Sequence, residues 1–92
     1  MFNKLKHLKD LRSQAKTIQG ALAQETISLE KNGVKIEMNG NMEITSLVLP
    51  DNLVKENLER TLTEGFNEII KKTQKVMAKK MQEMGGLPGF NQ

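Results

Sequence analysis

The sequence predicts an α+β fold: a long N-terminal helix, a three-stranded antiparallel β-meander and a long C-terminal helix follow one another along 92 residues. Apolar residues recur at helical spacing over both ends of the chain. Between them, two Asn-Gly pairs separate three short runs, and Asn-Gly is the strongest short signal for a β-hairpin. We expect one domain over residues 1–92, because so short a chain supports only one hydrophobic core.

The first expected element is a helix over about residues 3–24. Its apolar residues follow alternating steps of three and four, and from Leu8 to Leu22 they form an a/d seam two heptads long. The members of the whole stripe are Leu5, Leu8, Leu11, Ala15, Ile18 and Leu22. A seam of this kind is typical of a helix that packs against another helix.

Three strands are expected next, at about residues 26–31, 34–38 and 42–49. With Asn32-Gly33 as a two-residue loop, Leu29 lies opposite Ile36 and Ile27 lies opposite Met38. All four apolar side chains then share one face of the sheet.

The second turn sets the register of the third strand. A two-residue loop at residues 39–40 would put Ile36 opposite Glu43, which breaks the apolar face. A three-residue loop, Asn39-Gly40-Asn41, instead puts Ile36 opposite Ile44 and Met38 opposite Met42, so we expect this longer loop.

Leu47 and Leu49 then fall on the other face of the sheet, near the end of the third strand. Pro50 ends that strand, because it cannot donate a ladder hydrogen bond. An apolar pair on the second face needs its own cover. We therefore expect Leu47 and Leu49 to lie in an interface with another chain.

The last expected element is a helix over about residues 52–84, with Asp51 as its N-cap. Its apolar stripe comprises Leu58, Leu62, Phe66, Ile69 or Ile70, Val76 or Met77, and Met81. Such a helix is roughly 50 Å long, far longer than the small sheet that it covers. Gly85-Gly86 end it, and residues 85–92 are expected to form a flexible tail.

Positive charge is concentrated at the two ends of the chain. Residues 1–24 and residues 69–92 each carry a net charge of +4, whereas residues 25–51 carry −3 and residues 52–68 carry −2. If the two helices pack as antiparallel neighbours, both basic ends lie on the same side of the molecule. These helix tips then project beyond the sheet.

Two sets of cations within these ends share a helix face, at spacings i, i+3 and i+7: Lys9, Arg12 and Lys16 in the first helix, and Lys72, Lys75 and Lys79 in the second. One interpretation is solubility and compensation of the helix dipole. The other is attraction to phosphate. No aromatic residues are interleaved with these cations, which favours contact with a duplex backbone over stacking on single strands.

The sequence carries no pattern typical of an enzyme, a cofactor site or a small-molecule site. It has no cysteine, and its single histidine lies among lysines near the N-terminus, so neither a disulfide nor a metal site is expected to stabilise the chain. No run reaches the roughly 20 apolar residues of a membrane span, and no secretory signal is seen, so we expect a cytoplasmic protein. So short a chain buries little apolar surface by itself, so we expect contact with a second copy to supply additional buried surface.

The chain resembles the YbaB/EbfC nucleoid-associated proteins of bacteria over nearly its whole length. The resemblance rests on the order and spacing of several segments: "MFNKL" at the start, "QAKTIQ" at residues 14–19, "GVKIEMNG" followed by "MEITSLVLP", "GFNEIIKKTQ", and "MGGLPGF" near the end. In "GFNEIIKKTQ", Gly65 replaces the alanine that is common before Phe-Asn.

The resemblance implies a homodimer whose protomers join through their sheets, with helices that project like tweezers. It also implies binding of double-stranded DNA, nucleoid organisation and effects on gene expression, with no cofactor. The alternative is a small dimeric adaptor or chaperone-like module whose long helices hold another protein.

Overall fold

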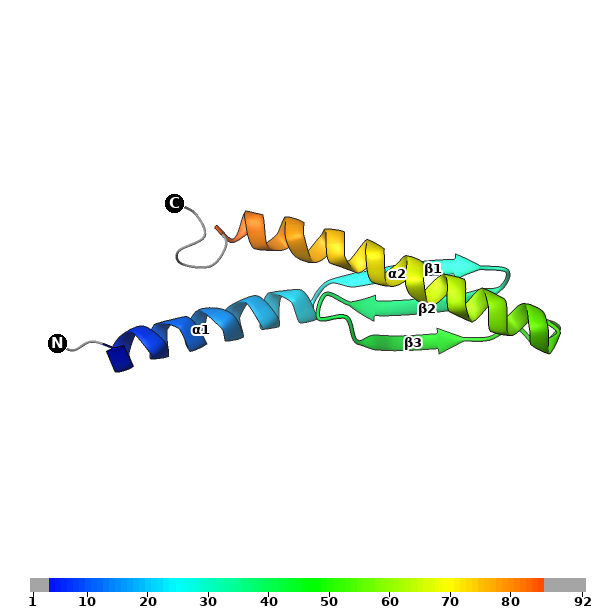
Figure 1. The fold of residues 1–92 in the computed structure, drawn as a ribbon, viewed down its shortest axis with the longest axis horizontal. Helices are drawn as coiled ribbons and strands as arrows, with labels where there is room; N and C mark the ends of the chain where they lie inside the picture. The colour runs from blue at the N-terminus through cyan, green and yellow to red at the C-terminus, as the bar shows by residue number, and fades with distance from the viewer. Residues whose placement is uncertain (1–3, 86–92) are drawn as a thin grey trace.

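The computed structural model describes residues 4–85, with side chains from Leu8 onward (Figure 1). The elements follow in the order α1 (Lys4–Ala23), β1 (Thr26–Lys31), β2 (Val34–Asn39), β3 (Ile44–Val48) and α2 (Lys55–Glu83). The predicted α+β class and the order helix, meander, helix are therefore confirmed. Of the predicted tail at residues 85–92, all but Gly85 lies outside the described residues.

The start of α2 differs from the prediction. Val54, not Asp51, is the N-cap of α2, and no side chain caps this end. Asp51 and Asn52 form a turn after the third strand, and Leu53 packs on the core before the helix begins. The chain needs these residues to pass from the edge of the sheet to the face that α2 covers.

The sheet has the strand order β1-β2-β3, and both pairs are antiparallel. The predicted register of the first hairpin is confirmed, with Leu29 paired to Ile36 and Ile27 paired to Met38. Asn32 and Gly33 both take positive φ, at 52° and 87°, as a tight two-residue turn requires.

The predicted register of the second hairpin is wrong. Met38 pairs with Ile44, and Ile36 pairs with Leu47, across an irregularity between Glu37 and Met38 that adds one residue to β3. The turn is longer than three residues because the Asn39 side chain closes it: Asn39 Oδ1 accepts hydrogen bonds from the backbone N–H groups of Asn41 and Glu43 at 2.9 and 3.1 Å.

The new register moves Leu47 to the opposite face from the one predicted. Leu47 shares its face with its partner Ile36, which is the face that α2 covers. Both Leu47 and Leu49 are nevertheless exposed, at 43% and 45%, because α2 packs on β1 and β2 and leaves β3 largely uncovered.

The core lies between α2 and the first two strands. It consists of Ile27, Val34, Ile36, Met38 and Ile69, with partly buried side chains of α2 around it. Gly65 allows the helix to approach closely, because a Cβ at this position would lie 3.0 Å from Ile36 Cδ1.

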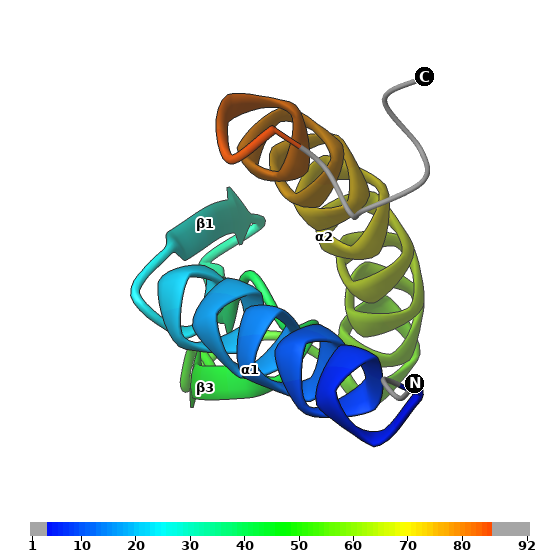
Figure 2. The same ribbon diagram turned by 90° about the vertical axis from the view of Figure 1, so that its left-hand side faces the viewer.

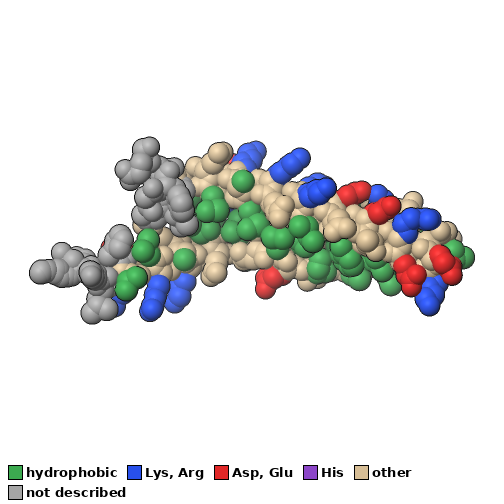
Figure 3. Space-filling model, viewed as in Figure 1, with side chains coloured by type: hydrophobic (Ala, Val, Ile, Leu, Met, Phe, Trp, Pro, Cys, Tyr) green, Lys and Arg blue, Asp and Glu red, His purple; other side chains and the backbone are tan. Residues whose placement is uncertain are grey.

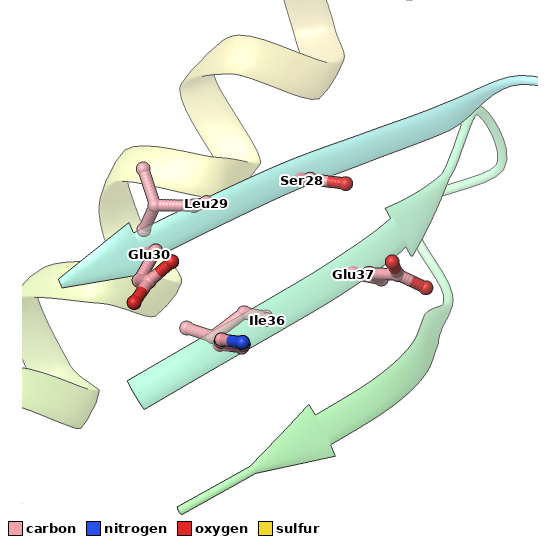
Figure 4. A pocket seen from close by; sticks show the side chains of 6 residues that line it. Ser28, Leu29, Glu30, Ile36 and Glu37 are labelled. Atoms are coloured by element: carbon pink, nitrogen blue, oxygen red, sulfur yellow. The ribbon is translucent and has the colours of Figure 1, made fainter. Parts of the chain in front are cut away.

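The other face of the sheet is polar, and Figure 2 shows no described helix over it. A shallow depression of about 240 Å³ lies there, lined by Ser28, Leu29, Glu30, Lys35, Ile36 and Glu37 (Figure 4). Its polar side chains alternate with the core residues of β1 and β2, as the two-residue period of a strand requires.

The alternation in β2 can be tested with two adjacent substitutions. We expect Ile36→Asp to prevent folding, because Ile36 is 1% exposed and an unpaired charge there has no partner. Glu37 is exposed on the polar face, so Glu37→Lys should change stability by less than about 0.5 kcal/mol. Circular dichroism during thermal unfolding measures both, and equal damage from the two changes would contradict this assignment of faces.

Candidate nucleic-acid interface

Both helices extend past the same end of the sheet, so that the molecule is elongated, with extents of 65 × 21 × 18 Å. Figure 1 shows α1 approaching the sheet from this end and α2 leaving toward it. The basic part of α1 and the basic C-terminal half of α2 therefore lie beyond the same end of the sheet, the side on which both basic ends were expected.

The three candidate cations of α1 are all exposed, and no ion pair involves them among the described side chains: Lys9, Arg12 and Lys16. The apolar seam of the same helix is covered only near the sheet. Leu22 is 4% exposed, whereas Leu8 is 51% exposed, and contact between α1 and α2 is slight. Within one chain, the second helix therefore leaves most of this seam uncovered.

The candidate cations of α2 divide into two kinds. Lys72 donates a hydrogen bond from Nζ to the backbone oxygen of Ser28 at 2.8 Å, which joins α2 to β1. Lys75 and Lys79 are exposed and have no ion pair with any described side chain. Lys71, which the sequence reasoning left as a flanking residue, is exposed in the same way.

Other lysines near the sheet are occupied by acids. Lys80 Nζ lies 3.6 Å from Glu25 Oε2, across the gap between α2 and the start of β1. Lys31 donates a hydrogen bond to Glu68 Oε1 at 2.6 Å and lies 3.5 Å from Glu64 Oε1. These lysines hold α2 against β1. Because carboxylates neutralise their charge, they attract an anionic ligand less than the exposed lysines do.

The hydrogen bond to Glu68 is the main cause that raises the pKa of Lys31 above its ordinary value of 10.5, and the attraction of both carboxylates acts in the same direction. Because the pKa of Lys31 is higher in the folded state, its contribution to stability is complete below the ordinary pKa. That contribution is lost only as the pH rises through the raised value. Lys31 therefore stays charged and paired at neutral pH.

Figure 3 shows how charge and apolar surface are distributed on one face of the molecule. A band of apolar side chains runs along the middle, and lysines and arginines lie on its two outer sides. The two sets of cations thus flank the apolar band and do not converge on one point within a single chain. Exposed apolar residues on and around β3 are Met42, Ile44, Leu47 and Leu49, with Val54 beyond the strand; Val48 is exposed too, but it pairs with Lys35 and so lies on the other face of the sheet.

Sequence reasoning identified only Leu47 and Leu49 in this surface. Ile44 was assigned to the buried face, but it is 45% exposed. The signal for exposure was present in the chain, since a third strand with apolar residues at both ends requires more cover than one helix supplies. The sequence did not show which strand the helix would leave open.

Within residues 4–85, no group of three or more His, Cys, Asp or Glu side chains is placed to hold a metal ion. In the same part of the chain, neither helix combines the length and the apolar character that crossing a membrane requires.

The model of the YbaB/EbfC DNA-binding family matches residues 1–87. The chain belongs to this family. The match spans both projecting helices and the whole sheet, so the basic tips are part of the family's domain.

A curated relative carries the name nucleoid-associated protein. It comes from Persephonella marina and is 36% identical over 73 residues, a match that covers 73% of this chain and 66% of that protein. The chain thus matches just under two thirds of the length of this relative.

The two kinds of lysine on α2 should differ in their effect on stability. We expect Lys72→Ala to lower the free energy of unfolding by about 0.5–1 kcal/mol, because it removes the hydrogen bond to Ser28. Lys75→Ala serves as the matched control and should change stability by less than about 0.5 kcal/mol. Urea unfolding followed by circular dichroism compares them, and equal losses would show that Lys72 does not anchor the helix.

Proposed function

We propose that this chain forms a homodimer that binds duplex DNA, mainly through contacts between phosphates and the basic tips of α1 and α2. The observation that carries this proposal is the exposed, unpaired set of cations on two helices that project past the same end of the sheet. Membership of a DNA-binding family supports it. The name of the relative favours a place in the nucleoid, where such a protein would organise DNA and affect gene expression.

Contacts with phosphate explain the type and placement of the cations. The candidate residues are five lysines and one arginine, and lysine acts as a point charge, which favours contact with phosphate over base readout. Within the described chain they lie on regular helices with no aromatic side chain beside them, so they provide no stacking platform for unpaired bases. Binding should therefore depend strongly on salt and weakly on sequence.

The structure favours some of the six candidates over others. Lys9, Arg12 and Lys16 on α1 and Lys75 and Lys79 on α2 are exposed, so they can reach a ligand without losing a partner within residues 4–85. Lys72 would have to give up its bond to the Ser28 carbonyl. We assign Lys72 a supporting role and place Lys71 beside the other exposed cations of α2.

The second copy is proposed to cover β3 on the face that Ile36 and Leu47 share. This proposed location is on the other face from the one that the sequence indicated, and it keeps Leu47 and Leu49 as proposed interface residues. Exposed apolar side chains continue from β3 toward α2, and the opposite face of the sheet is polar apart from Val48. Because β3 is also an edge strand, a partner copy would protect both its apolar side chains and its free backbone groups.

A protein partner is the second candidate, and the uncovered seam of α1 favours it. Leu8 is exposed, while Leu11 and Ile18 are only half-buried. An apolar helix of another protein could pack on this seam. Such binding would respond weakly to salt, in contrast to binding of phosphate.

The dimer makes a prediction about concentration. We expect the unfolding midpoint to rise with protein concentration, because dissociation and unfolding are coupled by mass action. Leu47→Asp should remove this dependence and yield monomeric or unfolded chains in light scattering, since it places a charge in the interface. Asn67→Asp on the exposed side of α2 adds the same charge and should leave the dimer intact. A folded monomer of the unsubstituted chain at micromolar concentration would refute the dimer.

DNA binding is tested by the salt dependence of affinity for a random duplex, measured by fluorescence anisotropy. If about four to six cations of the dimer reach phosphates, log K should fall against log salt with a slope of roughly −4 to −5. Replacing Lys75 and Lys79 with Ala should weaken binding to all sequences alike and reduce the magnitude of the slope by about two or more, since each change occurs twice in a dimer.

The control for this experiment removes the same charge elsewhere. Lys35 and Lys55 are exposed near the other end of the molecule, so their joint replacement by Ala should leave the slope unchanged. If Lys72, Lys75 and Lys79 are all replaced by Glu and a folded dimer still binds DNA normally, the tips are not the binding site. That result would favour the protein partner.

A further inference from the structure

The turn between β2 and β3 is bonded to the C-terminal end of α1. The backbone N–H of Gly40 donates to the carbonyl oxygen of Leu22 at 2.8 Å. The side-chain amide of Asn41 donates from Nδ2 to the carbonyl oxygen of Gln19 at 3.0 Å. The Leu22 oxygen also accepts from the backbone N–H of Glu25 at 3.1 Å, so the two bonds from Gly40 and Asn41 add a connection between the last turns of α1 and a turn that is distant in sequence. Figure 1 shows this turn beside the end of α1.

Hydrogen bonds within the turn between β2 and β3 make it rigid. Besides the two backbone bonds that Asn39 Oδ1 accepts, its Nδ2 donates to Glu43 Oε1 at 2.8 Å. A Cβ on Gly40 would lie 2.5 Å from the Leu22 oxygen, so only glycine permits this close approach. Met42 takes a φ of 64°, an uncommon value for a residue with a side chain. The turn therefore keeps a defined and slightly strained shape.

Few other contacts hold α1 in its direction. Leu22 is the one described residue of α1 that is buried, and the helix touches α2 only slightly. The rest of α1 extends away from the sheet, with Leu8 half exposed. The turn contacts α1 at its sheet end, whereas Lys9 and Arg12 lie near the far end. A small change in the angle of α1 at the turn therefore displaces these two cations by a larger distance.

We propose that Gly40 and Asn41 are positioning residues for DNA binding: the β2–β3 turn sets the direction of α1 and so the separation between the cations of α1 and those of α2. This inference rests on the proposed function, because it assigns the turn a role in presenting the same cations. Neither residue carries charge or needs to touch DNA. Their effect on affinity is exerted through the angle of α1.

The experiment removes the Asn41 amide and measures both geometry and affinity. Ser13→Cys and Gln74→Cys place spin labels on exposed sites of α1 and α2, in a chain that has no cysteine of its own. The labelled chain is refolded with an excess of unlabelled chain, so that each dimer carries labels on one chain only. Double electron–electron resonance then gives the distance distribution between the labels on α1 and α2. With Asn41→Ala we expect this distribution to broaden or shift.

In the chain without labels, Asn41→Ala should weaken binding to random duplex DNA about three- to fivefold, because the effect is bounded by the free energy of one hydrogen bond. The slope of affinity against salt should stay the same, since no cation is removed. Loss of a phosphate contact would instead reduce that slope. Gly40→Ala should act in the same direction and more strongly, although it also risks the fold.

Asn52→Ala is the matched control, since Asn52 is an exposed asparagine in the turn before α2. It should leave the distance distribution and the affinity unchanged. If Asn41→Ala leaves the distribution between α1 and α2 as narrow as before, the turn does not position α1 and the inference fails. If the distribution broadens but affinity for DNA is unchanged, the link to binding is refuted. If the unsubstituted protein binds no DNA, the proposed function fails separately, and with it the role assigned to the turn.

Discussion

One α-helix is too narrow to cover three strands. A helix with its side chains is about 10 Å wide, whereas neighbouring strands are about 4.8 Å apart, so one helix covers roughly two of them. In this protein α2 packs on β1 and β2, and the side chains beneath it at Val34 and Ile36 are fully buried. Ile44 and Leu47 lie on the same face of β3 and stay exposed. The proposed second copy follows from this shortage of cover, and its location follows from which strand is left open.

A second mismatch concerns length. α2 has 29 residues, about 44 Å at 1.5 Å per residue, whereas a strand of six residues spans only about 20 Å. Beyond Thr73 no described residue of α2 is fully buried, because the helix runs past the core, and Val76 is its last side chain packed on that core. The overhang can therefore carry charge at no cost to the core, and there the chain places Lys75 and Lys79. Over the sheet, in contrast, Lys31 and Lys72 are bonded to acceptors.

The two projecting helices are attached in different ways. α2 is attached along its side, through the apolar core and through lysine contacts with β1. α1 is attached at its end, through Leu22 and the bonds from Gly40 and Asn41. A helix attached along its side has a direction set by packing, whereas one attached at its end has a direction set by a few hydrogen bonds. The α1 arm is therefore the one whose position a local change in a turn can alter.

Much of this protein is determined by local chemistry and could be predicted from its sequence. The helical spacing of Leu8 to Leu22, the positive φ of Asn32-Gly33 and the pairing of Leu29 with Ile36 depend on residues close together in the chain. The identity of the exposed cations was also predictable, because lysine on a helix face remains in water unless an acceptor lies nearby. Tertiary structure decided where such acceptors lie. It placed the backbone carbonyl of Ser28 within hydrogen-bond distance of Lys72, and the pattern of side chains along the sequence does not indicate this contact.

Tertiary structure also decided the second hairpin. Counting alternation predicted a short loop, but the contact of Gly40 with the end of α1 and the ring of bonds around Asn39 favour a longer one. That difference moved Leu47 to the face of Ile36. The sequence by itself determined the elements and their charges, because these depend on neighbours along the chain. Only the folded chain determined which face of β3 is open and where α1 points, because both depend on contacts between residues far apart in sequence.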